Sequence, residues 1–294
     1  MPNIVCFGEV LWDVFPHDKK IGGAPLNVAV RSKLFGNEVS IISAVGNDKL
    51  GISILDYLKE NKVNTDCVQL LDKYKTGEVK VTLNSKGSAS YSIEYPSAWD
   101  KISITELSKN KVKKADALVF GSLITRDNVS KETLFELVKL AKYKVFDLNL
   151  RPPHFKKDIL IHLMEQSDFI KLNDEELYQV SNFLGSKFNS LEQNLKFIAK
   201  KTNTKHLCVT KGSFGAVLLY NEKLYYNSGY KIKVDDTVGA GDSFLGSLIS
   251  QLLSKENPQK AINLACAVGA LVAQNKGANP ELSFEDIDSF MNPQ

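Results

Sequence analysis

Residues 234–244, with the sequence Val-Asp-Asp-Thr-Val-Gly-Ala-Gly-Asp-Ser-Phe, place a glycine-rich turn and a carboxylate directly before an amphipathic stretch. Gly239, Ala240 and Gly241 carry little or no side chain, so their N–H groups can approach a phosphate at the positive end of the following helix. Asp242 stands beside this anion cradle and could accept the proton of a hydroxyl that attacks a phosphoryl group. The alternative is a tight turn of glycines in which Asp242 only stabilises the start of a helix.

A second glycine cluster, Gly22-Gly23-Ala24-Pro25-Leu26-Asn27, leads into a predicted helix near the N-terminus. The paired glycines can let a ligand approach the backbone, and the amide of Asn27 offers the donor and the acceptor that a polyhydroxylated substrate requires. Asp13, just past the first predicted strand, can accept hydrogen bonds from two hydroxyls of such a substrate. The alternative is a Gly-Gly turn, a proline at the helix start and a surface asparagine.

The hydrophobic pattern predicts the scaffold that must position these residues. Short β-branched apolar runs alternate with amphipathic stretches, as expected for βαβ units that build a mostly parallel sheet with helices on both faces. We therefore predict an α/β sandwich. Its strands are expected at residues 4–8, 39–44, 117–121, 144–148, 168–172 and 206–210, with a hairpin partner at 216–220.

Residues 76 to 95 break this alternation of strands and helices. GEVKVTLN, the turn SKGS and ASYSIEY predict an alternating two-stranded hairpin without a helix. Because such a hairpin cannot join the parallel sheet, we expect a small antiparallel lid over its carboxyl edge, contributed by about residues 9–22 and 76–98. No repeat, low-complexity tract or proline-rich linker is present, so we predict one domain over residues 1–294.

Composition and charge exclude several classes of protein. The chain has 294 residues, 43% of them hydrophobic, which suffices for one large α/β domain. A formal net charge of +3 gives no reason to expect nucleic acid or an anionic membrane as partner. The N-terminal segment lacks a basic leader and its apolar run contains Glu9 and Asp13, so we expect a strand there and a cytoplasmic protein. The cysteines and histidines show no spacing typical of disulfide frames or zinc sites.

Both glycine-rich segments resemble the signatures of a known family. GGAPLNVAV at 22–30 and DTVGAGDSF at 236–244 are similar to the two signatures of the ribokinase-like sugar kinases, often called the PfkB family, and the chain looks most like its fructokinases. The resemblance implies a ribokinase-like three-layer sandwich with a small β-sheet lid and ATP-dependent transfer to a sugar hydroxyl. It also implies that Asp242 is the catalytic base, that Gly239, Ala240 and Gly241 form the anion hole, and that Asp13, Gly22, Gly23 and Asn27 hold the sugar.

Asn173 and Glu176, at a predicted strand-to-helix junction, resemble the family's NxxE element, which positions Mg²⁺ and its waters near the nucleotide phosphates. Because the two residues are three apart, their side chains share a face. The same spacing also predicts a capping box, in which Asn173 and Glu176 satisfy free N–H groups without any metal. Both interpretations remain open from the sequence.

Asp147, Asn149 and Arg151 alternate at the end of a predicted strand, which would send all three side chains to the face that meets the active-site edge. Arg151 could there bind a substrate oxygen or developing phosphate charge, and the stretch resembles the DxNxR of fructokinase-like members. A solvated arginine before the Pro-Pro pair is the alternative. Arg126, in GSLITR, resembles another fructokinase-like feature and joins the substrate-binding candidates on that ground alone.

The resemblance places the nucleotide site in the C-terminal part of the chain. The turn beside the phosphates and ribose corresponds to Thr210, Lys211, Gly212 and Gly215. The loop near adenine corresponds to Asn275, Gly277 and Ala278. Asn263 and Cys266 lie on the helix between, and we expect core or surface roles for both. Relatives can hold a monovalent cation such as K⁺ between two of these loops, and here Asp236 is the candidate carboxylate ligand.

We therefore predict an ATP-dependent sugar kinase that uses Mg²⁺, with fructose as the first choice because Ala24-Pro25 after the glycine pair looks most fructokinase-like. Ketodeoxygluconate kinase, ribokinase and nucleoside kinase of the same family are the alternatives. A catalytically silent sugar or nucleotide sensor is another, against which the intact Asp242, Asn173 and Glu176 argue. The expected partners are a small sugar and ATP, with neither nucleic acid nor membrane, and the exposed lid edge could pair in a homodimer.

Overall fold

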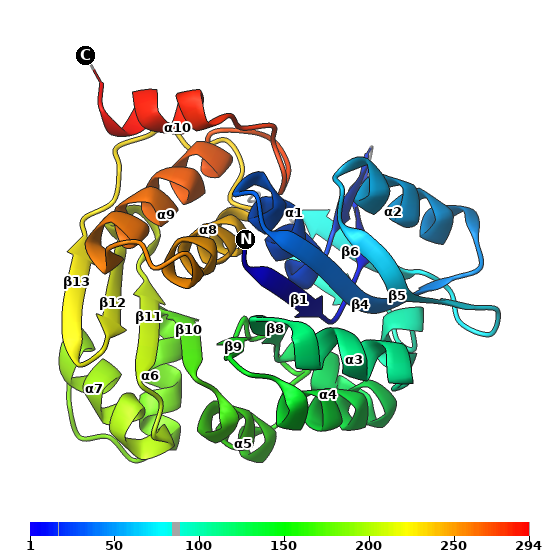
Figure 1. Ribbon diagram of the computed structural model, residues 1–294, viewed down its shortest axis with the longest axis horizontal. Coiled ribbons are helices and arrows are strands. Elements are labelled where there is room, and N and C mark those ends of the chain that lie inside the picture. The colour runs from blue at the N-terminus through cyan, green and yellow to red at the C-terminus, as the bar shows by residue number, and fades with distance from the viewer. Residues whose placement is uncertain (17, 84–88, 294) are drawn as a thin grey trace.

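The computed structural model describes residues 1–16, 18–83 and 89–293, and a large, mostly parallel sheet runs through its centre (Figure 1). The strands of this sheet are β1 (Asn3–Phe7), β4 (Glu38–Gly46), β5 (Asn64–Leu71), β8 (Ala117–Gly121), β9 (Lys144–Asp147), β10 (Phe169–Asn173), β11 (His206–Thr210), β12 (Ala216–Tyr220) and β13 (Lys223–Asn227). Their order is β13-β12-β11-β10-β9-β8-β1-β4-β5. β12 is antiparallel to both of its neighbours, and the other neighbouring pairs are parallel.

Helices cover both faces of this sheet, as Figure 1 shows. One face carries α1 (Ala24–Leu34), α2 (Lys49–Glu60), α8 (Ala240–Leu253) and α9 (Pro258–Ala273), with α10 (Phe284–Met291) packed on α9. The other face carries α3 (Glu106–Lys114), α4 (Asn128–Leu140), α5 (Lys157–Gln166), α6 (Asp174–Phe183) and α7 (Leu191–Thr202). Because side chains alternate along a strand, β1 sends Ile4 and Cys6 to one core and Val5 and Phe7 to the other. The predicted α/β sandwich is confirmed.

A second, smaller sheet stands apart from the large one. It contains β2 (Leu11–Val14), β3 (Lys19–Gly22), β6 (Gly77–Leu83) and β7 (Ala89–Ile93), in the order β3-β2-β6-β7. β6 and β7 pair antiparallel as the sequence predicts, while the predicted SKGS turn lies outside the described residues. The sheet packs on α2 through Trp12, whose Nε1 donates to the carbonyl of Leu50 at 3.1 Å.

Three details of the main sheet differ from the sequence prediction. The edge strands β5 and β13 were not predicted, because partly exposed edges need no continuous apolar run. β9 ends at Asp147, and Asn149 has a left-handed φ of 41°, so the predicted strand alternation through Arg151 is wrong. The chain leaves the sheet at this point instead of continuing its pleat.

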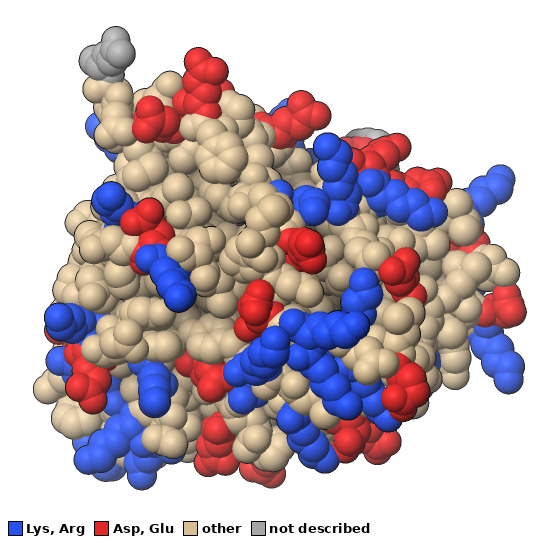
Figure 2. Space-filling view, viewed as in Figure 1, with Lys and Arg blue, Asp and Glu red and all other residues tan. Residues whose placement is uncertain are grey.

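The surface and the thiols agree with the charge and cysteine pattern of the sequence. On the face shown in Figure 2, basic and acidic side chains both occur over most of the surface, and several basic side chains gather in the lower centre. No helix within the described residues combines the length and hydropathy that crossing a bilayer requires. Cys6, Cys67, Cys208 and Cys266 are buried free thiols. Within residues 1–16, 18–83 and 89–293, no three side chains of His, Cys, Asp or Glu gather as a metal site would require.

Candidate active site

The candidate residues gather where the parallel strands end and α1 and α8 begin. α1 and α8 lie side by side over the sheet (Figure 1). Glu9 follows β1, Asp147 ends β9 and Asn173 ends β10, so all three occupy the carboxyl edge of the sheet. In open α/β sheets this edge is where ligands bind.

Gly239 shapes the predicted anion cradle at the start of α8. It is the N-cap of the helix with φ 75°, a left-handed conformation that favours glycine. A Cβ there would lie 2.5 to 2.6 Å from atoms of Ala278, so the loop after α9 packs directly on the turn. Ala240 and Gly241 form the first turn, whose N–H groups lack the intrahelical acceptors that later turns possess. This geometry can bind an anion.

Asp242 lies in that first turn and is held by α1. The Nδ2 of Asn27 donates to the Oδ2 of Asp242 at 2.8 Å, and the Oδ1 of Asn27 accepts from the Nδ2 of Asn279 at 2.7 Å. Burial raises the pKa of Asp242, while the Asn27 hydrogen bond and the charges of Lys171 and Arg151 oppose the rise. A carboxylate with a raised pKa and a fixed orientation is suited to accept a proton.

Lys171 is a functional candidate that the sequence interpretation missed. Its Nζ contacts the two carboxylate oxygens of Asp147 at 3.0 and 3.2 Å and lies 3.4 Å from the position a Cβ on Gly241 would take. Burial alone lowers the pKa of Lys171, but the charges of Asp147, Glu176 and Asp242 raise it, so the ammonium stays charged beside the anion cradle. A lysine inside the apolar strand IKLN was the available signal, because a buried charge requires a partner.

Two carboxyl groups face Asp242 from the N-terminal side. Asp13 lies within β2, and its Oδ2 occupies the space that a side chain on Gly22 would need. Burial and the charge of Asp242 raise the pKa of Asp13 to about 6. Glu9, which the sequence interpretation did not select, is 4% exposed, and burial and Asp242 raise its pKa to about 7.

The start of α1 lies directly over Glu9. A Cβ on Gly23 would meet the carbonyl oxygen of Glu9 at 2.5 Å, which explains why glycine precedes the helix. The Oε2 of Glu9 is buried and accepts no hydrogen bond from the described residues. Arg151 is exposed, its Nη1 donates to the carbonyl of Leu150 at 3.0 Å, and its charge lowers the pKa of both Glu9 and Asp13.

Arg126 occupies a different environment from the other sugar-site candidates. Its Nε and Nη2 donate to the two carboxylate oxygens of Asp100 at 2.7 and 2.8 Å, and Nη2 also donates to the carbonyl of Glu94 at 2.6 Å. The guanidinium stacks on Trp99, 4.0 Å from its ring centroid. These contacts indicate a buried structural ion pair, so the structure does not bring Arg126 into the group around Asp242.

The Asn173 and Glu176 side chains form the capping box that their spacing predicts. The Oδ1 of Asn173 accepts from Glu176 N at 2.7 Å, and the Oε2 of Glu176 accepts from Asn173 N at 2.8 Å. The Oε1 of Glu176 accepts from Leu150 N at 2.7 Å. Both carboxylate oxygens of Glu176 already have donors, so these residues fit a magnesium ion through its water shell better than by direct contact.

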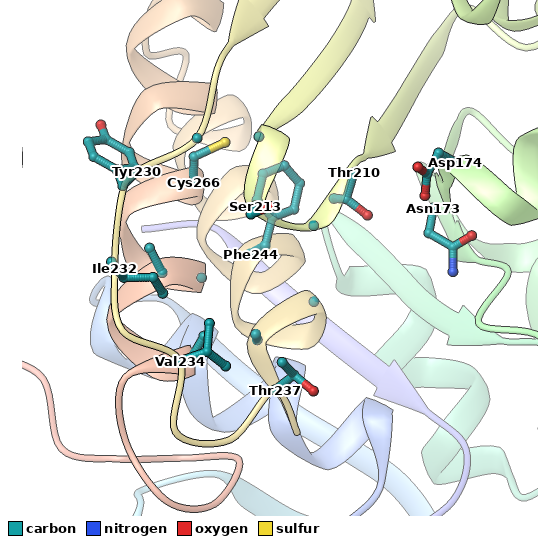
Figure 3. Close-up of a pocket in the computed structure, with 18 of the residues that line it drawn as sticks. Asn173, Asp174, Thr210, Ser213, Tyr230, Ile232, Val234, Thr237, Phe244 and Cys266 are labelled. Atoms are coloured by element: carbon teal, nitrogen blue, oxygen red, sulfur yellow. The ribbon is translucent and has the colours of Figure 1, made fainter. Parts of the chain in front are cut away.

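A pocket of about 460 Å³ adjoins the anion cradle. Ala240 and Gly241 line it, as do Thr210, Gly212 and Gly215 from the predicted phosphate and ribose turn. Figure 3 shows the apolar side chains Tyr230, Ile232 and Val234 toward one side and the polar Thr210, Asn173 and Asp174 toward the other. The volume and the mixed lining fit a nucleotide with an apolar base and charged phosphates.

Cys266 and Asn263 separate in the structure. Cys266 belongs to the hydrophobic core on this face of the sheet, as expected, and it also lines the pocket (Figure 3). The Oδ1 of Asn263 instead accepts from Asn227 at 3.0 Å and from Gln259 at 2.9 Å. The sequence could not decide between the two faces of an apolar helix.

The remaining nucleotide candidates lie around this pocket without lining it. Asn275 donates from Nδ2 to the carbonyl of Leu271 at 2.8 Å at the end of α9. The charge of Lys211 lowers the pKa of the Cys266 thiol against the dominant effect of burial. Gly277 and Ala278 contact the lid strand β3 and Gly239 respectively.

Asp236 ties two of these loops together. Its Oδ1 accepts from Val238 N and its Oδ2 from Gly277 N, both at 3.0 Å, and the Nζ of Lys20 lies 3.6 Å from Oδ2. A monovalent cation would have to compete with these donors and with the Lys20 ammonium. The role of Asp236 as a ligand of K⁺ stays a prediction.

Comparison with known proteins agrees with the site. A family model described as "pfkB family carbohydrate kinase" matches residues 1–284. The chain is 30% identical to "Probable fructokinase-6, chloroplastic" of Arabidopsis thaliana over 96% of this chain and 80% of that protein. It is 28% identical to "Fructokinase-2" of Solanum habrochaites over 95% of this chain and 92% of that protein. The solved fructokinase with bound ATP from Xylella fastidiosa superposes with a TM-score of 0.86 at 25% identity, covering 98% of both chains.

Proposed function

Since the chain belongs to the pfkB family of carbohydrate kinases and is therefore an ATP-dependent sugar kinase, we propose that its sugar substrate is fructose. The observation that carries this proposal is the position of Asp242. Ala240 and Gly241, directly before it, line the nucleotide-sized pocket, while Asn27 holds its carboxylate on the side of Glu9 and Asp13. The proposed base therefore stands between the two substrates.

In the proposed reaction a primary hydroxyl of the sugar attacks the γ-phosphorus of ATP in line. The new O–P bond forms as the bond to the β-phosphate oxygen breaks, and Asp242 accepts the hydroxyl proton. The N–H groups of residues 239–241 stabilise the charge on the transferred group. The ammonium of Lys171, beside Gly241, adds positive charge at the same place.

Magnesium is the metal that this reaction needs, because it neutralises charge on the β- and γ-phosphate oxygens. Asn173 and Glu176 would orient its water ligands. Asp174, in the first turn of α6, lines the pocket and supplies a further carboxylate for those waters. The small sheet is proposed to act as a lid that keeps bulk water from the transferred group, and its edge as the contact of a homodimer.

The charge of the sugar side favours a neutral substrate over a phosphorylated one. Three carboxyl groups, Glu9, Asp13 and Asp242, influence one another there, and the charges of Arg151, Lys20 and Lys171 oppose them. Carboxylates accept hydrogen bonds from sugar hydroxyls, whereas each of them would repel the phosphate of a phosphorylated sugar. Fructose supplies one primary hydroxyl for Asp242 and others for Asp13 and Asn27.

The test is an ADP-release screen of the full chain with fructose, glucose, mannose, ribose, ketodeoxygluconate, adenosine and fructose phosphates, with and without K⁺. We expect fructose to give the highest kcat/KM and fructose 6-phosphate to be poor. A sugar that leaves buried polar groups unpaired loses about 1 to 3 kcal/mol for each group. If ketodeoxygluconate or ribose exceeds fructose by more than about tenfold, about 1.4 kcal/mol in the transition state, the choice of fructose is wrong. The kinase assignment would stand.

A further inference from the structure

Asn279, in the loop between α9 and α10, begins a chain of side-chain hydrogen bonds that ends at the proposed base. Its Nδ2 donates to the Oδ1 of Asn27 at 2.7 Å, and the Nδ2 of Asn27 donates to the Oδ2 of Asp242 at 2.8 Å. The three residues are separated by 252 and 215 positions in sequence. Neither signature segment of the sequence contains Asn279, and its position in the loop gave no signal.

The two contacts of Asn27 together determine which way its amide points. A carboxamide has one accepting oxygen and one donating nitrogen, so a flipped Asn27 would turn its oxygen toward the carboxylate of Asp242. The flipped amide would also set its own NH₂ against the NH₂ of Asn279. Because Asn27 is 3% exposed, water cannot replace either lost hydrogen bond. The donor from Asn279 therefore favours the orientation in which Asn27 donates to Asp242.

Arg31 anchors the loop that carries Asn279. Its Nη2 donates to the carbonyl of Pro280 and its Nε donates to the Oγ of Ser243, both at 3.1 Å. Arg31 lies one helical turn after Asn27, is 3% exposed, and so ties α1, the start of α8 and the loop together. The guanidinium of Arg31 thus holds Ser243, next to Asp242, and Pro280, next to Asn279.

We propose that Asn279 is a positioning residue for phosphoryl transfer, which orients the Asn27 amide so that Asp242 is held through Oδ2 and keeps Oδ1 for the sugar hydroxyl. This inference rests on the proposed function, in which Asp242 is the base. Within the described residues no donor is recorded for the Oδ1 of Asp242. Asn279 acts through Asn27 and contacts neither substrate.

The electrostatic consequence provides a readout that a purely structural role would not change. The Asn27 hydrogen bond lowers the pKa of Asp242 against the effect of burial, together with Lys171 and Arg151. Glu9 and Asp13 face Asp242 with the opposite effect. If the Asn27 amide loses its orientation, the pKa of Asp242 should rise. As the pH is lowered, the variant should then lose activity at a higher pH than the natural protein does.

The experiment compares Asn279→Leu and Asn279→Asp with the natural chain, using the best sugar of the screen. For Asn279→Leu we expect kcat to fall about tenfold or more, because the base is no longer held in one geometry. The acid limb of kcat/KM should move up by about half to one pH unit, and KM for ATP should change little. Asn279→Asp should lose more, because a carboxylate facing the Oδ1 of Asn27 favours the flipped amide.

A double-mutant cycle with Asn27→Ala separates positioning from general loss of packing. Once the Asn27 amide is absent, Asn279→Leu should add less than about a twofold further loss. Fully additive losses, an unshifted acid limb or a full-rate Asn279→Leu enzyme would each refute the inference. If the leucine variant melts at a lower temperature than the natural chain, Asn279→Ser repeats the test. The serine side chain is too short to reach Asn27 and is smaller than leucine.

Asp242→Asn distinguishes a failure of this inference from a failure of the proposed function. The amide keeps the shape of the carboxylate but cannot accept the proton. If Asp242→Asn is inactive and Asn279→Leu is fully active, only the positioning role fails. If Asp242→Asn retains its kcat, the role of the base fails and the positioning role with it.

Discussion

Glu9 shows how strongly the site concentrates unpaired negative charge. Its carboxyl group is almost fully buried, its Oε2 has no donor among the described residues, and Asp242 lies within electrostatic range. Burial favours the protonated form of this carboxyl group, although hydrogen bonds from the backbone of Glu9 and of Ala24 oppose the effect. At neutral pH the Glu9 carboxyl is therefore near the midpoint of its titration, and it can either donate to a sugar hydroxyl or accept from one.

We predict that Glu9→Gln makes the unfolding free energy less dependent on pH. The pKa of Glu9 is about 7 in the folded chain against an ordinary 4.5, so the folded state keeps a proton that the unfolded state has released. Stability from this group is complete below pH 4.5 and is lost as the pH rises to about 7. The loss amounts to about 3 kcal/mol at about 1.4 kcal/mol per unit.

Urea unfolding of both proteins at about pH 4.5 and about pH 8 measures this difference. Carboxyl groups distant from Glu9 titrate equally in the two chains, so their effects cancel, whereas Asp242 loses a neighbouring charge in the variant. At each pH, the unfolding free energy of the natural chain is subtracted from that of the glutamine variant. This difference should be about 3 kcal/mol larger at about pH 8 than at about pH 4.5. Equal pH dependence in the two proteins would mean that Glu9 is ionised in the folded state.

At this scale the sequence identified the residues whose roles depend on local pattern. The glycines at 239 and 241 and the carboxylate at 242 stand next to one another, so their chemistry is visible in one segment. Lys171 and Asn279 act through partners that are distant in sequence, and nothing near them indicates those partners. Arg126 was a candidate through the family resemblance alone, and in the structure Asp100 and Trp99 occupy its guanidinium.

At the scale of secondary structure, Glu176 joins three segments of the carboxyl edge. It caps α6 through Asn173 N and also accepts from Leu150 N, in the stretch that follows β9. A capping box ordinarily serves one helix. Here the same carboxylate also fixes where the chain turns after leaving the sheet, next to Arg151.

We predict that Glu176→Gln destabilises the fold by about 1 to 3 kcal/mol, because a carboxamide has only one oxygen for two backbone donors. Denaturant unfolding measures the change. Glu175→Gln, on the exposed side of the same helical turn, is the matched control and should change stability little. A magnesium titration of both variants tests the separate proposal that Glu176 orients the metal's water. A stable Glu176→Gln protein with a raised magnesium requirement would assign Glu176 to the metal instead of to the fold.

In the large sheet, the sequence predicted the strands that are buried along most of their length and missed those that are partly exposed. Strands buried on both faces, such as β8 and β11, gave apolar runs with the observed bounds. Half of the residues of β5 are polar, and no residue of β13 is fully buried, so neither gave an apolar run. The end of β9 was overestimated because the left-handed turn at Asn149 depends on tertiary contacts and not on the pattern of side chains.

At the scale of the whole molecule, Lys20 links the small sheet to the nucleotide side of the large domain. It lies on β3 directly opposite Asp13 of β2, and its aliphatic chain packs on Gly277. Its ammonium approaches Asp236, which in turn accepts from Gly277 N. One side chain therefore contacts both the sugar-side strand pair and the loop behind the anion cradle.

We predict that Lys20→Met reduces the effect of bound sugar on nucleotide affinity. In the natural chain, saturating fructose should tighten binding of a non-hydrolysable ATP analogue by about fivefold or more, since ordering the small sheet also orders the loop at Gly277. Calorimetric titration with and without fructose measures this effect. Lys19→Met is the matched control, because Lys19 pairs with Glu78 inside the small sheet at 2.8 Å. If both variants keep the full effect, Lys20 does not transmit it.

The contacts of Asn27 with Asp242 and Asn279 join the two ends of the chain at the reacting centre. Contacts between residues so distant in sequence form late, because the loops they close are long. During synthesis, a ribosome-bound chain whose last helices, α8 to α10, are still inside the ribosome contains β1 and β2 but lacks the folded α8 that carries Asp242. When the unfolded protein is refolded, the return of enzymatic turnover therefore marks the completion of folding. Secondary structure can return before folding is complete.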